Sequence, residues 1–404
     1  MRAANERAAT RLLAALLLAL CLPSARGAET IELSNSSDDD AIAELDELPK
    51  LSSPAPQQRL RLSGWADMGY TAATSATGPL AVAPQMNHFG DEFLLNQLAI
   101  TAERPVDPDE LSFGYYTQLF GGADAYDLQG PGDIQSVNDH FGFTIRQANL
   151  RAHLPVFTAR GMDVVVGRQG SLMGYESYMA PMRTLYSVSY QWWYAEDGAD
   201  TGTWATVHAT DEWDLTGGVT FGSNTFFELR GTAPCYIVQA RQWFDRQRSL
   251  YQCATLVIGD QSIGKTSVIE PGKLTTVCEY RIQFAATERW TQVFQANGGW
   301  DSQVKYIGFG QWYGVLEASI VKLTDELDAQ LRLEWFDDAN GVRTGFATDY
   351  VSMTPGFIVH LGPQMSVRPE FRADFAGRRV FGRFESLSRQ RSQFTPAVEC
   401  VFTF

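Results

Sequence analysis

The last stretch of the chain, residues 393–404, alternates strictly between two kinds of side chain. One face consists of Phe394, Pro396, Val398, Cys400, Phe402 and Phe404, and the other consists of Gln393, Thr395, Ala397, Glu399, Val401 and Thr403. A period of two predicts a β-strand with one apolar face and one mainly polar face. The stretch ends on an aromatic residue, whereas the termini of soluble proteins are usually polar and frayed. It predicts either a strand of a membrane barrel or an ordinary edge strand.

The same alternation recurs along the chain, at 60–71, 97–103, 147–154 and 365–375. In the last of these segments four charged residues share one face, opposite a face of apolar residues. The charged residues are Arg368, Glu370, Arg372 and Asp374. So many charges on one side of a strand need a wet interior, and a soluble sandwich rarely repeats this pattern without a second apolar layer. The segments together predict an all-β protein.

The connections between these segments alternate between short and long. Short connections are predicted at 105–108, 156–160, 210–212, 245–247, 287–289, 324–326 and 362–364. Long connections are predicted at 75–91, 121–142, 169–200, 222–234, 259–272, 299–308, 337–348 and 376–390. Short turns on one side and long loops on the other are typical of transmembrane barrels, so we expect an antiparallel transmembrane β-barrel of about 16 strands, within a range of about 14–18. Both ends of the barrel then lie on the short-turn, periplasmic side.

Aromatic clusters at predicted strand ends fit the girdles at the two membrane surfaces. They are Tyr115-Tyr116, Trp192-Trp193-Tyr194, Trp312-Tyr313 and Trp335-Phe336. Ordinary core aromatics are the alternative interpretation.

The N-terminal part predicts three segments. Residues 1–27 combine basic residues, a short apolar run and Ala25-Arg26-Gly27, which is typical of a secretory signal peptide. Residues 28–58 hold eight acidic residues against Lys50, which favours an acidic disordered periplasmic segment. Residues 59–404 form the predicted barrel. The formal net charge of −15 argues against nucleic-acid binding.

Motifs for chemistry are weak, so we expect no enzyme, no cofactor and no metal site. Residues 259–266 fit the phosphate-loop pattern, but Pro271-Gly272 leave no room for the required helix. The five histidines show no pair at ligand spacing, and a Ser/His/Asp site built from distant strands is the minor alternative. The spacing of Cys235, Cys253 and Cys278 is not that of a metal site. Export makes disulfides feasible, so a Cys235–Cys253 disulfide is an alternative, and we expect Cys400 to face lipid as a free thiol.

Short motifs in a consistent order resemble the OmpL-like family of β-barrel porins. They are Ser63 to Tyr70, Leu95 to Leu98, Gly121 to Asp124, Val166 to Arg168, Gly174 to Glu176 and Arg368 to Asp374. The resemblance covers about residues 58–404 and implies a bacterial outer-membrane barrel with porin function. The terminal Phe402 and Phe404 also resemble the aromatic signal that the barrel assembly machinery reads. Outer-membrane lipid and that machinery are therefore the expected partners.

The expected function is passive diffusion of small polar solutes or ions through a water-filled barrel, since about sixteen strands leave an aqueous channel. Candidate pore-lining residues are Arg146, Arg151, Asp328, Arg332, Glu334, Arg368, Glu370, Arg372 and Asp374. The alternatives are cross-strand ion pairs at these positions, a non-conducting barrel that binds or adheres through its outer loops, and an exported β-sandwich such as a carbohydrate-binding module.

The longest predicted connection, 169–200, is a candidate constriction loop. It has no predicted element of its own, and loops of this length are usually functional. Its candidate residues are Tyr175, Glu176, Arg183 and Tyr186. By analogy with general porins we expect it to fold into the channel, and a flexible surface loop is the alternative. A homotrimer is a further alternative to a single barrel, and neither the solute nor the ion preference follows from the sequence.

Overall fold

A computed structural model describes residues 60–404 except 73–77, 80–85, 88, 131, 135–137, 139, 247–248, 261–273, 305–306 and 383–387. The predicted signal peptide, the acidic segment 28–58 and most of the phosphate-loop-like motif lie outside the described residues. Within the described chain, no helix is long and apolar enough to cross a membrane.

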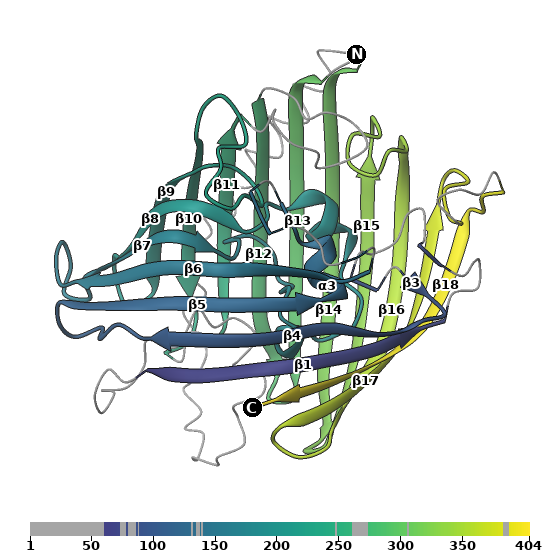
Figure 1. The fold of residues 1–404 in the computed structure, drawn as a ribbon, viewed down its shortest axis with the longest axis horizontal. Coiled ribbons are helices and arrows are strands. Elements are labelled where there is room, and N and C mark those ends of the chain that lie inside the picture. The colour runs from purple at the N-terminus through teal and green to yellow at the C-terminus, as the bar shows by residue number, and fades with distance from the viewer. Residues whose placement is uncertain are drawn as a thin grey trace. The chain divides into compact units, whose positions relative to one another are not determined.

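Sixteen strands pair into one closed antiparallel barrel, which confirms the predicted fold class and strand number (Figure 1). The first eight are β1 (Arg61–Thr71), β4 (Phe93–Arg104), β5 (Ser112–Gly122), β6 (Gly142–Leu154), β7 (Met162–Gln169), β8 (Asp200–His208), β9 (Trp213–Thr220) and β10 (Cys235–Trp243). The other eight are β11 (Tyr251–Gly259), β12 (Leu274–Thr287), β13 (Trp290–Val304), β14 (Gly308–Thr324), β15 (Leu327–Asp338), β16 (Thr348–His360), β17 (Met365–Ala376) and β18 (Ser392–Thr403). Each strand pairs with its neighbours in the chain, and β1 pairs with β18.

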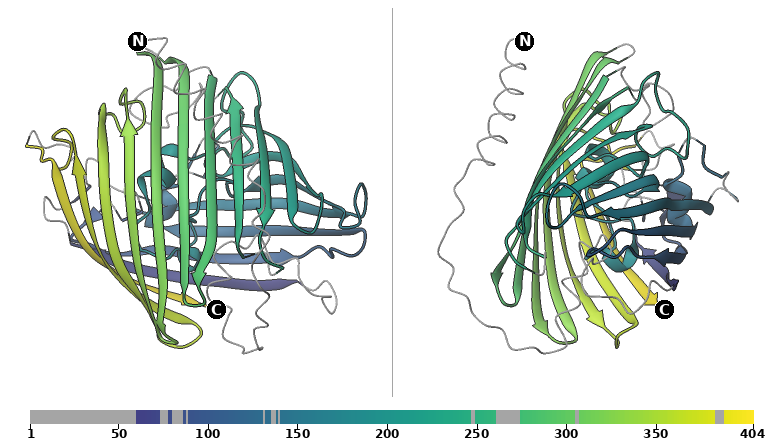
Figure 2. Two further views of the ribbon diagram at one scale, coloured as in Figure 1. Left: turned by 180° about the vertical axis from the view of Figure 1, so that it is seen from behind. Right: turned by 90° about the vertical axis from the view of Figure 1, so that its left-hand side faces the viewer.

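A few short elements lie in the loops. β2 (Gly78–Pro79) and β3 (Phe89–Gly90) form a small separate sheet between β1 and β4. The helix α3 (Ala123–Asp127) follows β5, and the loop between β7 and β8 contains the 3₁₀ turn η2 (Ala180–Met182) and the π-helical turn η3 (Gln191–Ala195). The views in Figure 2 show that the strands are tilted rather than upright, and such a tilt relative to the barrel axis is required to close a sheet into a barrel.

Alternation decides which side chains face inward. In β17, Phe371 and Phe375 are 44% and 47% exposed, whereas Arg372 and Asp374 have no exposed surface. The free sulfur of Cys400 lies on the outward face of β18 between Val398 and Phe402, and Cys235, Cys253 and Cys278 are also free thiols. Polar residues therefore point into the barrel and apolar ones toward lipid, as the sequence predicts.

Two sequence-based predictions are wrong. The predicted long loop at 299–308 does not form, because β13 continues to Val304 and pairs with β14 from Gly308 onward. The predicted girdle also fails in part: Trp312 and Phe336 have no exposed surface, and residues 192–194 lie in η3. The physical reason is the strand period, which turns one residue of each adjacent aromatic pair inward.

The barrel closes at the C-terminal residue. The backbone N–H of Phe404 donates to the carbonyl of Gly64, and the N–H of Gly64 donates to the carbonyl of Phe404, both at 2.9 Å. A Cβ atom at position 64 would lie 2.6 Å from the Phe404 ring, so glycine leaves the space in which that ring packs. The same ring stacks on Phe402 at a centroid distance of 6.3 Å. Phe404 thus joins the last strand to the first.

We expect Phe404→Ser to lower the amount of folded barrel in the outer membrane while export continues, because the closing contact and the terminal aromatic are both lost. Heat-modifiable migration on gels measures the folded fraction. Phe113→Ser is the matched control, since Phe113 is 62% exposed on the outward face of β5, which pairs with neither strand of the seam. Equal losses in the two variants would contradict a special role for the terminal residue.

We also expect Phe371→Arg to reduce assembly strongly, because a charge on the lipid face near the midplane costs about 2–4 kcal/mol. Phe371→Leu, which keeps an apolar side chain at the same position, should assemble normally. The folded fraction in outer-membrane extracts is the measurement, and equal yields of the two variants would show that Phe371 does not face lipid.

Candidate functional site

The candidate site is the loop 170–199 together with the inner wall that it contacts. The loop leaves β7 at Gln169 and returns to β8 at Asp200. Tyr175, Tyr186 and Tyr190 of the loop are at most 6% exposed, although connecting segments normally run over a protein surface. Burial at this level means that the loop lies inside the barrel, as the following contacts show.

The first part of the loop is bonded to β12 and β13. The backbone N–H of Gly174 donates to Glu279 Oε1 at 3.0 Å, and that of Tyr175 donates to Gln295 Oε1 at 2.7 Å. Gly174 has a φ of 91°, and a Cβ atom there would lie 1.9 Å from the carboxylate of Glu196. Glycine is therefore required at this position both for its left-handed conformation and for the close approach of Glu196.

The middle of the loop crosses to the seam of the barrel. The Arg183 guanidinium lies 3.0 Å from Glu399, 3.4 Å from Asp67 and 3.8 Å from Asp124. Arg368 on β17 pairs with Glu399 at 2.9 Å and donates to the carbonyl of Ala180 at 2.7 Å and to that of Arg183. One loop arginine is thus held by carboxylates of β1, β18 and the helix α3.

A third set of bonds holds the end of the loop against β15 and β17. Glu370 accepts the N–H of Ser187 at 3.1 Å, and Glu334 accepts the N–H of Tyr190 at 2.7 Å. In the opposite sense, Arg332 donates to the carbonyl of Ser187 at 2.6 Å and Arg372 donates to that of Val188 at 2.8 Å. Wall charges therefore replace the backbone partners that a strand or helix would supply.

Glu176 closes this network from the loop side. Its carboxylate lies 2.5 Å from Arg332 and accepts the N–H of Ser189 at 2.6 Å. Aromatic contacts add to it, because Tyr190 stacks on Tyr350 at 5.0 Å and lies against Phe336 at 6.1 Å. The loop is consequently packed as well as hydrogen-bonded.

Two carboxyl groups, Asp124 in α3 and Glu196 in the loop, have raised pKa values. Burial raises the pKa of Asp124 in α3 to about 8, although Arg183 and the amide of Gln97 oppose the shift. Burial and the nearby Glu279 also raise the pKa of Glu196 well above its usual range. Both groups thus hold a proton more readily than exposed carboxyls do, which lowers the negative charge beside the loop.

The structure places the nine candidate pore-lining residues on inward faces, but they differ in their contacts. Arg332, Glu334, Arg368, Glu370 and Arg372 bond to the loop. Asp374 pairs with Arg372, Arg146 donates to Asn224 and to the carbonyl of Leu128, Arg151 donates to Asn149 and lies over the Tyr116 ring, and Asp328 lies 2.9 Å from His360.

All four candidate loop residues lie inside the barrel. Tyr175 bonds through its N–H, Glu176 and Arg183 through their charges, and Tyr186 through its hydroxyl, which lies 3.1 Å from Asn96 Oδ1.

Sequence reasoning missed several partners of the loop. Asp67, Gln97, Glu279, Gln295 and Glu399 all contact it from the wall. Each occupies a polar position of an alternating strand, which is the one signal that could have found them. Alternation does not show which inward residues meet a distant loop, so the set could not be selected.

A second cluster lies at the short-turn ends of β6 to β10. His153 and His208 contact the two oxygens of Asp163 at 2.7 and 3.1 Å, and His208 also contacts Asp214 at 2.7 Å. The sequence showed no histidine pair because these residues lie on different strands. In the part of the chain that is described, no group of three or more His, Cys, Asp or Glu residues is arranged to hold a metal ion.

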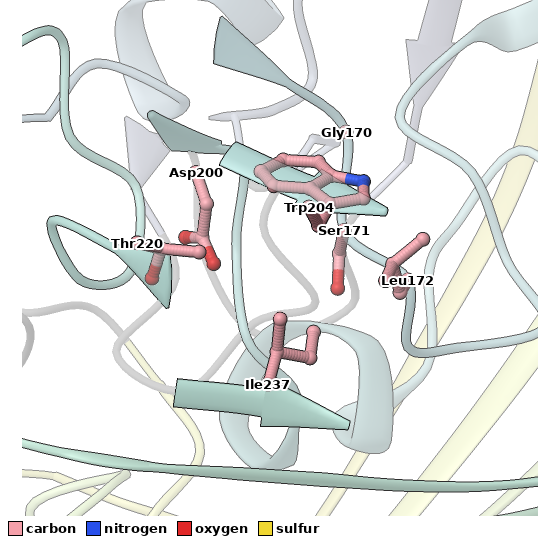
Figure 3. A pocket seen from close by; sticks show the side chains of 7 residues that line it. All are labelled: Gly170, Ser171, Leu172, Asp200, Trp204, Thr220 and Ile237. Carbon is pink, nitrogen blue, oxygen red and sulfur yellow. The ribbon is translucent and has the colours of Figure 1, made fainter. Parts of the chain in front are cut away.

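A small pocket lies where the loop leaves β7 (Figure 3). It is lined by Gly170, Ser171, Leu172, Asp200, Trp204, Thr220 and Ile237. The Trp204 ring lies over the base of the loop, with Asp200 and Thr220 on one side and Ile237 below. This pocket is the gap between the loop base and the wall of β8 to β10.

The closed barrel with an inward loop defines the class: an outer-membrane β-barrel of the porin type. Residues 59–404 match the family described as "Putative beta-barrel porin-2, OmpL-like", and the chain belongs to that family. The protein is therefore a porin of the outer membrane.

Solved structures show the same fold at low identity. The channel DcaP of Acinetobacter baumannii has 11% identity and a TM-score of 0.57, covering 85% of this chain and 97% of its own. An anion-selective porin from Comamonas acidovorans has 10% identity and a TM-score of 0.58, covering 86% and 99%. OmpF of Salmonella typhi, in complex with daunomycin, has 13% identity and a TM-score of 0.55, covering 86% and 98%. A comparison with curated proteins gave no match.

We expect Arg183→Met to displace the loop from the inner wall, because removing one partner of a buried ion pair leaves an uncompensated charge. The loss of stability is about 3–5 kcal/mol. Limited proteolysis of the assembled barrel should then cut within 170–199, where the parent protein is protected. Arg160→Met is the matched control, since the Arg160 side chain is 36% exposed and lies 3.9 Å from Asp211 at a short turn. Continued protection of the loop in Arg183→Met would contradict the assigned role.

Proposed function

We propose that this porin passes only ions and small polar solutes, by passive diffusion, and that loop 170–199 sets the limit. One observation carries the proposal: the loop is bonded to β12 and β13 at its start, to β1 and β18 in its middle, and to β15 and β17 at its end. A segment held on these separate parts of the wall crosses the lumen. The space that remains for a solute is therefore narrower than a barrel of this size would otherwise leave.

Charges of both signs lie beside the loop. The arginines that contact the loop or pair with its carboxylate partners are Arg146, Arg183, Arg281, Arg332, Arg343, Arg368 and Arg372. The carboxylates there are Asp67, Glu176, Glu279, Glu334, Glu370, Asp374 and Glu399, whereas the raised pKa of the nearby Asp124 keeps that group protonated near neutral pH. Fixed charge at a constriction selects the opposite sign of ion, and because these charges are nearly balanced, a single carboxylate such as Glu176 can decide the ion preference.

Because the loop 170–199 occupies part of the lumen, the alternative function is that of a non-conducting barrel that acts through its outer loops. Those loops are bonded to one another and to the wall: Asn224 donates to the carbonyl of Leu128 at 3.2 Å, and Arg168 donates to both oxygens of Asp133 at 2.6 and 2.9 Å. Loops held by such bonds suit binding as well as they suit a channel mouth. The closed barrel, in contrast, excludes the exported β-sandwich.

We further propose that residues 1–27 direct export, that the barrel assembly machinery inserts the chain through its terminal aromatics, and that three copies associate in the membrane. Support for association comes from OmpT of Vibrio cholerae, a structural neighbour that is described in a trimer form, with a TM-score of 0.53. We assign no catalytic step and no cofactor to the protein.

We expect deletion of residues 172–186 to raise single-channel conductance in a planar bilayer, because the segment that crosses the lumen is removed. Glu176→Gln should shift the reversal potential toward anions, because Arg332 then lacks the carboxylate that lies 2.5 Å from it. Glu212→Gln, in an exposed short turn, is the matched control for the charge change. Absence of conductance in both the parent and the deletion variant would favour the binding role, and unchanged values in the loop variants would place the loop outside the conducting path.

A further inference from the structure

The outward faces of β13 and β14 carry a polar cluster where lipid contact is expected. Glu317 alternates with Leu316 and Ala318, which are 1% and 4% exposed inside the barrel, so Glu317 points outward. Its cross-strand partners are Phe294 and Leu333, which are 44% and 41% exposed on the same outward face.

Glu317 is bonded to two neighbours on this face. Ser319 Oγ lies 2.8 Å from both Glu317 Oε1 and Gln292 Oε1, and Gln292 Nε2 donates to Glu317 Oε1. Glu317 lies in the interior of the 17-residue strand β14, far from both of its ends. In the described strands, every other carboxylate or basic side chain that points outward lies within two positions of a strand end.

A second polar cluster lies beside the first, on the outward faces of β10, β11 and β12. Gln252 Nε2 donates to Gln242 Oε1 at 2.8 Å, and the hydroxyl of Tyr280 donates to Gln252 Oε1 at 2.7 Å. We call the two clusters together the polar face: Gln242, Gln252, Tyr280, Gln292, Glu317 and Ser319.

Small residues surround the polar face. Outward positions of β9 to β13 hold Gly217, Ala240, Ala254, Ala296 and Gly298. Outward positions of β16 and β17, in contrast, hold Val351, Met353, Phe357, Phe371 and Phe375, all between 44% and 47% exposed. The polar face is thus flanked by small residues, which alternate there with exposed apolar side chains such as Tyr236, Val238 and Phe294.

Both properties point away from lipid contact. A carboxyl group within the hydrocarbon layer is costly and normally faces protein or water rather than lipid chains. Small residues let two surfaces approach closely enough for hydrogen bonds between them, as they do at contacts between membrane helices. We infer that the polar face is the surface through which copies of this chain pack against one another in the membrane. The inference rests on the proposed association of copies and is independent of conduction.

Hydrogen-bond complementarity makes a second copy the occupant. One half of the polar face supplies donors, because the amides of Gln242 and Gln252 have N–H hydrogens beyond the one used within the face, whereas the other half centres on the acceptor Glu317. In a closed ring of copies, one half of each surface meets the other half of the next copy. The donor half of one barrel would therefore meet the carboxyl half of its neighbour.

Cysteine cross-linking in outer-membrane fragments tests this directly. All four described cysteines are first replaced by serine, and Ala296→Cys then places a thiol near the middle of the polar face. Ala102→Cys is the matched control, because Ala102 is also a half-buried alanine on an outward face, on β4. We expect oxidation to join two copies in Ala296→Cys and to leave Ala102→Cys uncoupled.

A second variant separates contact from proximity. Glu317→Leu should lower the multimer fraction of the detergent-extracted protein several-fold while the heat-modifiable barrel still forms; Val351→Leu should change neither. Cross-linking at Ala102 alone would overturn the choice of face but keep the association. A single-barrel mass with no cross-link at either site would overturn the association itself. A cross-link from Ala296→Cys to another protein would overturn the choice of occupant.

Discussion

Charged groups of the barrel wall bond to the backbone of one loop, and the arrangement of the lumen depends on this interaction. A segment inside a barrel has no strand partner for its N–H and C=O groups, and burying them unpaired is costly. Here the carboxylates of Glu279, Glu334 and Glu370 accept loop N–H groups, while Arg368 and Arg372 donate to loop carbonyls. The loop is stable inside the barrel because the wall supplies charges of both signs.

The same interaction explains why the interior charges do not destabilise the fold. Arg332 and Arg372 are almost completely removed from solvent, which is tolerable only when each is paired and hydrogen-bonded. Their partners are Glu334 on β15, Asp374 on β17 and Glu176 of the loop. Without the loop these side chains would instead line the interior of the barrel, which is why we propose that the position of the loop decides both the width of the channel and its charge.

The outer surface follows a different rule, because lipid offers no hydrogen bonds. Over most of the barrel the outward positions are large and apolar, as lipid contact requires. The polar face departs from this rule with a carboxylate in the middle of a strand, and its carboxyl, amide and hydroxyl groups are already bonded to one another. A second barrel on this face would offer polar groups that lipid cannot, which connects the side chains of five strands to the assembly of the protein.

The period of two by itself determined that the chain is all-β and on which side each residue lies, since one face of every strand must meet lipid and the other the lumen. The alternation of short and long connections determined the strand number. It correctly predicts that Phe371 faces outward and Arg372 inward. It could not predict that Trp312 packs beneath the loop or that β13 continues to Val304, because burial by a loop and strand length depend on contacts distant in sequence. The tertiary structure alone decided that Arg183 meets Asp67, Asp124 and Glu399, since closure of the barrel brings the first and last strands together around it.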